Sequence, residues 1–236
     1  MKLKIKNLNK SYETKEIFND LNFTFESGKI YGLLGRNGAG KTTFFNILND
    51  DIDCESKEFI LSDSNQKIKD LSTSDIGYVT TIPAVPEFLT GYEFLKFFLE
   101  INKDKIKDLK DIDYYFSLVN IKEEDRKLLL KDYSHGMKNK MQFLINIITN
   151  PQIILLDEPL TSLDIVAQDE MKNLLKNLKN NHIIILSTHI LELALDLCDE
   201  IVIINNKQFE LVSKKNLLKE TYKTEILNIL KGLNNA

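Results

Sequence analysis

A glycine-rich segment of the chain has the residue types and spacing that bind phosphate groups. Residues 35–42 fit the pattern G-x-x-x-x-G-K-[ST], between an apolar run at 30–34 and a predicted helix at 43–48. Glycines let consecutive backbone N–H groups point at a polyanion, and a helix N-terminus adds positive potential. Lys41 supplies a positive charge for the β- and γ-phosphates, and the Thr42 hydroxyl is suited to Mg²⁺. The segment therefore predicts a nucleoside triphosphate site rather than a chance glycine-rich turn. The residues predicted to contact the nucleotide here are Gly35, Arg36, Asn37, Gly38, Ala39, Gly40, Lys41, Thr42 and Thr43.

Two acidic residues follow a second apolar run. Asp157 and Glu158 come directly after residues 153–156, and Pro159 ends the stretch. An aspartate at the tip of a buried strand beside a phosphate-binding loop is placed to hold Mg²⁺, directly or through water. Glu158 projects differently and is placed to polarise an attacking water as a general base. The alternative is an acidic turn that merely ends the strand, and the nearby phosphate-binding loop favours the catalytic interpretation.

The elements that must position these groups alternate along the chain. Three short apolar runs, at 153–156, 183–186 and 201–204, are typical of strands buried on both faces. Helical patterns at 166–178 and 190–197 lie between them. Strands that alternate with helices predict a mostly parallel sheet with helices on both faces, which is an α/β core.

Two further regions differ from this core. Near the N-terminus, apolar and polar residues alternate, which predicts half-buried antiparallel strands. The alternating apolar residues are Leu3, Ile5, Leu21, Phe23 and Phe25. Residues 84–148 have amphipathic helical spacing instead, and predict an inserted helical subdomain. We therefore expect one domain over 1–236, made of an α/β core with the N-terminal strands (1–83 and 149–205), the helical subdomain (84–148), and a lysine-rich tail (206–236) that is weakly amphipathic at 216–233.

Composition excludes several classes of protein. The 236 residues are 43% hydrophobic and 28% charged, which is enough for a sizeable core. The net charge of −4 and the presence of only two arginines, Arg36 and Arg126, argue against a nucleic-acid partner. Cys54 and Cys198 have no metal or redox spacing. No apolar run approaches the ~18–20 residues that span a bilayer, and no signal peptide is recognisable, so we expect a soluble, intracellular protein.

These segments together resemble the nucleotide-binding subunit of ATP-binding cassette (ABC) transporters over residues 3 to 205. The loop at 35–43 and the acidic strand at 153–158 resemble the family's Walker A and Walker B segments. Residues 160–164 resemble its D-loop, and Ser-Thr-His at 187–189 resembles the segment that carries its switch histidine. Tyr12 stands where the family usually has an aromatic residue that stacks on adenine.

The family's signature, usually Leu-Ser-Gly-Gly-Gln, is matched by Tyr-Ser-His-Gly-Met at 133–137. The resemblance implies that two cassettes dimerise head to tail, with each ATP between one Walker A loop and the partner's signature. Ser134 and the backbone around Gly136 would then contact the γ-phosphate bound to the other chain. His189 would contact the γ-phosphate in its own chain, and Asp164 would couple the two sites. Without the resemblance, Ser134 is also explained as a helix N-cap, and Tyr12 and His189 as packed structural residues.

Two departures from the family pattern have chemical consequences. In the signature, His135 and Met137 replace glycine and glutamine, and His135 adds an imidazole side chain. Thr81 stands where the family's Q-loop has a glutamine that reaches Mg²⁺ and the attacking water. A threonine hydroxyl is too short for both contacts and would act through water. We therefore expect slow or partner-dependent turnover.

The resemblance implies an ATPase that uses ATP and Mg²⁺ and powers a separate permease, as a homodimer or with a second cassette. It would be cytoplasmic, held at the inner face of the cell membrane by a permease that contacts the helical subdomain around 88–99. The signature and short tail resemble exporter cassettes for drugs, peptides or lantibiotics. The alternative is a soluble ABC protein that acts on ribosomes or as a regulator, although such ribosomal proteins generally carry two cassettes and this chain has one phosphate-binding loop. A chromosome or repair ATPase would need a coiled-coil insertion between 43 and 133, where no sustained heptad pattern occurs.

Overall fold

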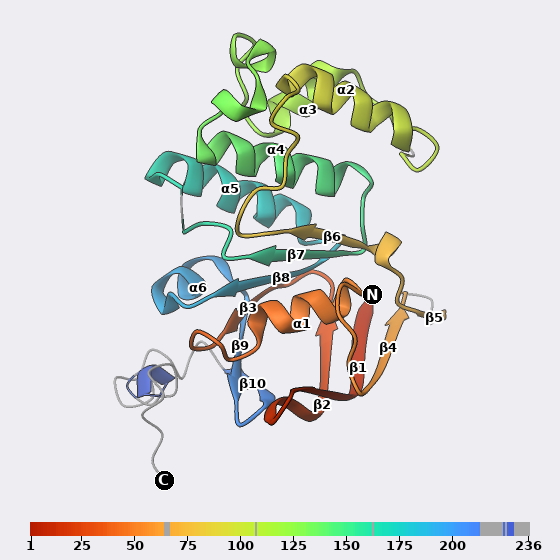
Figure 1. Cartoon of the computed structure of the whole chain (residues 1–236), viewed down its shortest axis with the longest axis vertical. Coiled ribbons are helices and arrows are strands. Elements are labelled where there is room, and N and C mark those ends of the chain that lie inside the picture. Colours follow the sequence, from red (N-terminus) through yellow and green to blue (C-terminus); the bar gives the residue numbers. More distant parts are fainter. Residues whose placement is uncertain (64–66, 107, 162, 213–223, 225, 229–236) are drawn as a thin grey trace.

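The computed structural model describes the chain except for residues 64–66, 107, 162, 213–223, 225 and 229–236. The weakly amphipathic segment predicted at 216–233 lies largely outside the described residues. Two sheets and a set of helices form layers, with the helical subdomain at the top of the view and the antiparallel strands at the bottom (Figure 1).

The central sheet has six strands in the order β10-β9-β3-β8-β7-β6. Neighbouring strands from β9 to β6 pair in parallel, and β10 pairs with β9 in antiparallel fashion. The strands are β3 (Ile30–Leu34), β6 (Ile76–Val79), β7 (Ile153–Asp157), β8 (Ile183–Thr188), β9 (Glu200–Asn205) and β10 (Gln208–Val212). In this register Asp157 lies beside Ser187, and Leu34 lies beside Thr188. The carboxyl ends of β3, β8 and β7 therefore meet at one edge.

The second sheet is antiparallel and has the order β2-β1-β4-β5. Its strands are β1 (Lys2–Tyr12), β2 (Lys15–Glu26), β4 (Ser56–Ser62) and β5 (Ile68–Asp70). Along β1 and β2, Leu3, Ile5, Leu21 and Phe25 are buried and alternate with more exposed residues. The alternation in the sequence therefore predicted this antiparallel pair.

Helices cover both faces of the central sheet (Figure 1). The α-helices are α1 (Lys41–Leu48), α2 (Gly91–Asn102), α3 (Ile112–Leu118), α4 (His135–Ile148), α5 (Ile165–Leu178) and α6 (Leu191–Leu197). Short 3₁₀ helices lie at Thr73–Asp75, Asp125–Lys127 and Leu130–Asp132. Thr90 begins α2 with a capping box, since its side chain accepts from the Glu93 N–H and the Glu93 carboxylate accepts from the Thr90 N–H.

Successive residues of the central strands point into two different hydrophobic cores. Ile154 and Leu156 pack in a core with residues of α2 to α6. Ile153 and Leu155 pack in a second core with α1 and the antiparallel sheet. Because side chains alternate across a strand, burial on both faces requires the continuous apolar runs seen in the sequence. The predicted α/β fold class is confirmed.

The central sheet continues into the range predicted as a tail, because β10 lies at residues 208–212. Asn206 and Lys207, which join β9 to β10, both have positive φ angles of 46° and 65°. That backbone conformation favours a tight hairpin between antiparallel strands. Phe209 of β10 is 8% exposed and its ring lies 4.8 Å from that of Phe44 in α1. The C-terminal hairpin is thus part of the core.

The apolar residues predicted on the helical subdomain divide between its core and its surface. Phe94, Leu95 and Leu99 of α2 pack in the core shared with α4 and the central sheet. Phe88 and Phe97 are exposed, at 79% and 55%. Helical spacing identified the helix, but α2 carries apolar residues on more than its buried face.

Candidate functional site

The glycine-rich segment forms the turn between β3 and α1. Only glycine fits at Gly40, the last position of this turn. Gly38 and Gly40 have φ angles of 76° and 111°, which favour glycine. A Cβ on Gly40 would lie 2.6 Å from the Cγ2 of Ile17 and 3.0 Å from the Cζ of Phe18. Gly40 is also the N-cap of α1, so the backbone enters the helix directly from the turn. This geometry places a helix N-terminus at the edge of the sheet, as phosphate binding requires.

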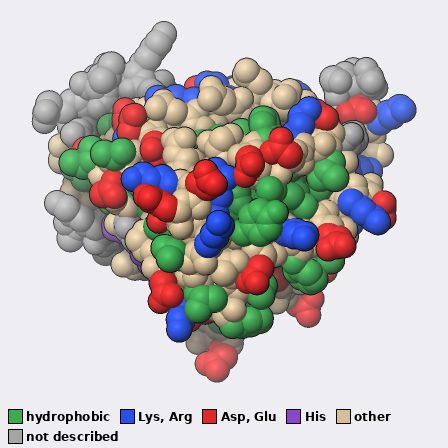
Figure 2. Space-filling model, turned by 90° about the horizontal axis from the view of Figure 1, so that it is seen from above, with side chains coloured by type: hydrophobic (Ala, Val, Ile, Leu, Met, Phe, Trp, Pro, Cys, Tyr) green, Lys and Arg blue, Asp and Glu red, His purple; other side chains and the backbone are tan. Residues whose placement is uncertain are grey.

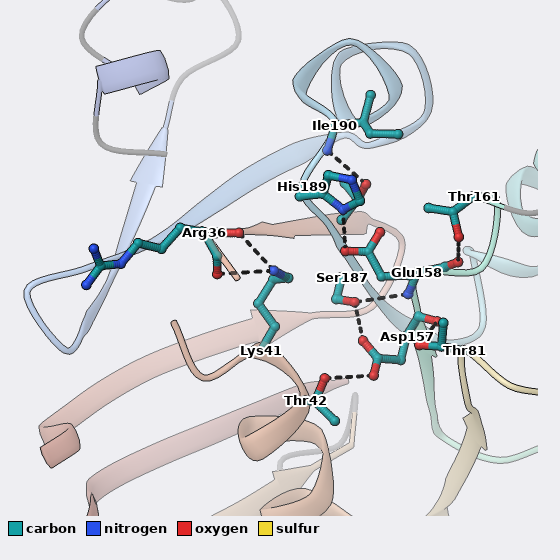
Figure 3. Close-up of polar contacts among 12 residues, drawn as sticks. Arg36, Lys41, Thr42, Thr81, Asp157, Glu158, Thr161, Ser187, His189 and Ile190 are labelled. Carbon is teal, nitrogen blue, oxygen red and sulfur yellow. Dashed lines mark hydrogen bonds and ion pairs between the residues drawn. The ribbon is translucent and has the colours of Figure 1, made fainter. Parts of the chain in front are cut away.

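Lys41 folds over this turn. Its Nζ donates to the carbonyl of Gly35 at 2.8 Å and to that of Arg36 at 3.5 Å (Figure 3). The residue is 7% exposed, and burial lowers the pKa of Lys41 although the charges of Glu158 and Asp157 act in the opposite direction. A buried ammonium held by main-chain carbonyls is a ready partner for an anion.

Asp157 joins three elements at the end of β7. Its Oδ2 accepts from the Thr42 hydroxyl of α1 at 2.8 Å, and its Oδ1 accepts from the Ser187 hydroxyl of β8 at 2.5 Å. Its main-chain oxygen accepts from the Thr81 hydroxyl at 3.0 Å. Asp157 is 5% exposed. The aspartate predicted to hold Mg²⁺ therefore lies in contact with the threonine predicted to share that role.

Glu158 has one carboxylate oxygen in a hydrogen bond and one without. Its Oε1 lies 2.8 Å from Nδ1 of His189, while its buried Oε2 has no hydrogen-bond partner. Its backbone has a φ angle of 50°, in the left-handed region, and its N–H donates to the Ser187 hydroxyl at 3.0 Å. A carboxylate oriented by an imidazole, with one oxygen left for a proton, has the arrangement of a general base.

These groups surround one cleft of about 380 Å³. Most of the predicted nucleotide and metal ligands line it: Tyr12, Asn37, Gly38, Gly40, Lys41, Thr42, Thr43, Thr81, Asp157 and Glu158. Tyr12 is 46% exposed, and the Nζ of Lys10 lies 4.6 Å from its ring centroid. Lys15 and Ile17 line the cleft too, although neither was predicted from the sequence. They follow Tyr12 across the β1–β2 turn, so their closeness to Tyr12 in the sequence was the signal that could have identified them.

Arg36 and Ala39 lie on the other side of the loop. With Lys15, Gly38 and Lys207 they line a second pocket of about 320 Å³. The Arg36 side chain extends away from Lys41 and Glu158, whereas its carbonyl points toward Lys41 (Figure 3). Its main chain therefore belongs to the predicted site, and its side chain does not reach the cleft.

The predicted signature and D-loop residues are not among those that line the cleft. Ser134 is the N-cap of α4 and accepts from the Met137 N–H at 3.2 Å. Asp164 is the N-cap of α5 and accepts from the Ala167 N–H at 2.9 Å. The two helix starts are close, because a Cβ on Gly136 would lie 3.4 Å from Cδ2 of Leu163. The structure brings the signature and D-loop to each other, but not to their own chain's cleft.

The two substitutions noted in the sequence occupy defined positions. Nδ1 of His135 lies 3.0 Å from the Nδ2 of Asn139, one turn further along α4. Thr81 lines the cleft, and its hydroxyl is already donated to the main chain of Asp157. Thr81 is thus near the predicted metal ligands through the backbone of Asp157 rather than through its carboxylate.

The residues of the cleft fit a magnesium nucleotide. Mg²⁺ prefers oxygen ligands and is usually bound by one or two carboxylates together with substrate phosphates. Thr42 and Asp157 supply such oxygens side by side. The Lys41 ammonium donates to the Gly35 carbonyl of the loop that would hold the phosphates. Within the described part of the chain, no three His, Cys, Asp or Glu side chains gather into a metal site. The donor set therefore suits Mg²⁺ completed by phosphate oxygens.

Comparison with known proteins agrees with this geometry. The family model for the ABC transporter matches residues 18–161. The chain is 35% identical over 205 residues to an uncharacterised ABC transporter ATP-binding protein from Methanocaldococcus jannaschii, covering 86% of this chain and 74% of that protein. It is 31% identical over 201 residues to the lantibiotic transport ATP-binding protein SrtF of Streptococcus pyogenes, covering 84% of each. The dimeric post-hydrolysis structure of an ATP-binding cassette bound to ADP and Pi is similar in fold, with a TM-score of 0.72 at 21% identity over 88% of this chain and 96% of that chain.

The fold and site define a P-loop ATPase cassette. The chain belongs to the ABC transporter family, as its ATP-binding subunit. ATP hydrolysis is general for that family. Among the described residues, no helix combines the length and the apolar character needed to cross a bilayer.

Proposed function

We propose that this chain binds and hydrolyses ATP as part of a head-to-tail dimer and powers a separate membrane permease, as an exporter of a drug, peptide or bacteriocin-type molecule. The observation that carries this proposal is that Glu158, held by His189, lines the same cleft as Lys41, Thr42 and Asp157. The resident ligands would be ATP and Mg²⁺.

The hydrolytic step follows from the positions of these side chains. Lys41 and the backbone N–H groups of the loop would neutralise the phosphates, and Thr42 and Asp157 would hold the metal. When bound, Mg²⁺ supplies charge neutralisation at the β- and γ-phosphate oxygens. His189 orients the Glu158 carboxylate through Oε1, and that carboxylate would take the proton of an attacking water. The products are ADP and phosphate.

The dimer is supported by the separation of the two predicted halves of the ATP site. Gly136 lies beside Leu163, and neither Ser134 nor Gly136 lines the cleft of its own chain. A second copy, or a related cassette, would bring its signature to this cleft and receive this chain's signature in return. Asp164, one residue from Leu163, would then lie at the contact between the two sites.

The permease contact is supported by exposed apolar residues on the helical subdomain. The view onto this end of the molecule has hydrophobic side chains gathered between acidic and basic ones (Figure 2). Phe88 is 79% exposed, and Phe97 and Ile101 of α2 are 55% and 60% exposed. Binding to a permease here would hold the chain at the inner face of the cell membrane. The similarity to SrtF favours export as the direction.

The proposal is tested by capture from native membranes. Tagged chain carrying Glu158→Gln is incubated with detergent-solubilised membranes and Mg-ATP, and the retained proteins are identified. The matched controls are the same variant with Mg-ADP and the double variant Glu158→Gln/Phe88→Ser. We expect a membrane protein with several spans, retained with ATP and weakened by the Phe88 change. Ribosomal proteins without any such membrane protein would overturn the transporter role and support a soluble ABC protein.

A further inference from the structure

One buried hydroxyl touches both acidic residues of the candidate site. Ser187 lies on β8 and is 0% exposed. Its Oγ donates to Oδ1 of Asp157 at 2.5 Å and accepts from the N–H of Glu158 at 3.0 Å (Figure 3). A serine hydroxyl has one proton to donate and lone pairs to accept, so one atom can make both bonds.

We propose that Ser187 is a positioning residue for ATP hydrolysis, which holds the Asp157 carboxylate against Thr42 and the Glu158 backbone in its left-handed conformation. This inference rests on the proposed function, because it assigns Ser187 to the reaction of the same cleft. Ser187 acts through its two neighbours and has no contact of its own with the reacting atoms.

Ser187 first orients the Asp157 carboxylate. The two oxygens of this carboxylate are each held by one hydroxyl, from Thr42 on α1 and from Ser187 on β8. Because the two hydroxyls come from different elements, together they fix the rotation of the carboxylate. Without the Ser187 hydroxyl, only the Thr42 contact would remain. The carboxylate could then rotate, and the oxygen that faces Thr42 would lose its fixed orientation. Groups that orient a metal-binding side chain in this way typically contribute 10- to 100-fold to metal affinity or activity, in order of magnitude.

Ser187 also holds the backbone of Glu158. Glu158 follows the last strand pair of β7, Asp157 with Ser187, and turns into the left-handed region at φ 50°. A non-glycine residue keeps that conformation only where its surroundings enforce it. The Ser187 hydroxyl accepts a hydrogen bond from the Glu158 N–H, just beyond the last strand pair. The Thr161 hydroxyl donates to the Glu158 carbonyl at 3.0 Å. The backbone so fixed directs the Glu158 carboxylate to His189.

Three variants at one position test the proposal. Ser187→Ala removes the hydroxyl, Ser187→Thr keeps it, and Ser187→Cys fills the same space with a weak donor. The matched control is Thr188→Val, because Thr188 is equally buried on the same strand and its hydroxyl accepts from the Ile190 N–H. Each purified chain is assayed for ATP turnover and for ATP affinity by calorimetry, once with Mg²⁺ and once with EDTA.

We expect Ser187→Ala to lower turnover by roughly 10- to 100-fold and to reduce the gain in ATP affinity that Mg²⁺ provides, with affinity in EDTA near that of the wild type. Ser187→Thr should restore both quantities, Ser187→Cys should fall between, and Thr188→Val should match the wild type. Should the alanine variant fail to fold, the comparison of cysteine with serine decides.

Three results would overturn the positioning role: unchanged turnover and metal-dependent affinity in Ser187→Ala, an equal loss in Thr188→Val, or, where alanine does not fold, a cysteine variant equal to the wild type. Failure of the proposed function has a different signature, since the wild-type chain would then hydrolyse no ATP. The metal-dependent part of ATP binding would still report on Ser187 in that case.

Discussion

The start of α1 and the start of α4 are alike in design and differ in what surrounds them. Each helix start combines a glycine with a residue able to contact phosphate, Gly40 with Lys41 at α1 and Gly136 with Ser134 at α4. At the start of α1, the Thr42 hydroxyl donates to Asp157 at the end of β7. Asp157 also accepts hydrogen bonds from Ser187 of β8 and from Thr81. At the start of α4, Ser134 and His135 make local contacts, since Ser134 caps its own helix and His135 meets Asn139.

This difference indicates which residues should act within one chain and which should act only with a second cassette. The geometry around α1 is fixed by bonds within the chain, so changes there should disturb chemistry or nucleotide binding in the isolated protein. Ser134 and His135 are held by hydrogen bonds within α4, so changes there should matter mainly when a second cassette supplies or receives a nucleotide. The following predictions test that contrast.

The largest effect is expected from Glu158→Gln. Loss of the carboxylate that would take the proton should lower ATP turnover by about 10²- to 10⁴-fold. ATP affinity should stay close to that of the wild type, because the glutamine side chain has nearly the same shape and the phosphate-binding loop is unchanged. Phosphate release and calorimetry measure the two quantities. Normal turnover in this variant would remove Glu158 from the role of base.

A pair of glycine substitutions compares the two helix starts directly. Gly40→Ala places a Cβ 2.6 Å from Ile17 on a backbone with φ 111°, so the loop must distort. Strain of about 1–3 kcal/mol should lower ATP affinity of the isolated chain by roughly ten- to hundredfold. Gly136→Ala places a Cβ 3.4 Å from Leu163 and 3.9 Å from the Ser134 Oγ, which are ordinary contacts, and should leave ATP binding by one chain intact while lowering turnover. Equal ATP affinities for the two variants, measured by calorimetry, would contradict the contrast.

Two variants of Ser134 separate capping from phosphate contact. Ser134→Ala removes the N-cap of α4 and should lower the free energy of unfolding by about 1 kcal/mol. Ser134→Asp keeps a good cap but places a negative charge where a partner's γ-phosphate is expected, so stability should persist and turnover should fall about tenfold or more. Urea unfolding and phosphate release measure these effects. Wild-type turnover in the aspartate variant would leave Ser134 as a cap alone.

The smallest effect is a pH dependence remote from both helix starts. His182 is 4% exposed, and burial lowers its pKa although the hydrogen bond to the Pro151 carbonyl opposes that shift. As pH falls below about 6.5, the unfolded chain binds a proton at this histidine more readily than the folded chain does. The free energy of unfolding should therefore decrease with falling pH, by at most about 1.4 kcal/mol per pH unit from this group.

Replacing the histidine isolates that contribution. His182→Asn should make the free energy of unfolding depend less on pH between about pH 7 and pH 5, a range that contains the ordinary histidine pKa of about 6.5. Urea unfolding measures this dependence. The matched variant for comparison is His135→Asn, at an exposed position. ATP affinity should be unaffected in both. An identical pH slope in the two variants would assign the dependence to other groups.

The sequence predicted the parts of the site that depend on local order. Gly40 and Lys41 follow one another in a turn that dictates its own backbone, and Asp157 ends an apolar run that could only be a buried strand. The contact of Asp157 with Ser187 depends on the register between β7 and β8, which brings together residues 30 positions apart. Periodicity does not specify such a register, so the double hydrogen bond of Ser187 could not be predicted.

The fold shows the same division between local and tertiary information. The strands and helices of the α/β core follow from their apolar patterns. The exposure of Phe97 and the burial of Phe94 on one helix depend on how α2 packs against α4, and the hairpin at Asn206 depends on a short turn inside a polar stretch. Both features are settled by packing rather than by local preference.

Phe209 connects the far end of the chain to the helix that begins at the phosphate-binding loop. Its ring lies within 6.3 Å of four others, and the nearest is Phe44 of α1 at 4.8 Å. A shortened gene that stops at Asn205 would keep every recognised motif and yet remove this ring from beneath α1. The boundary of a functional expression fragment is therefore set by aromatic packing at β10, several residues beyond the end of the sequence resemblance.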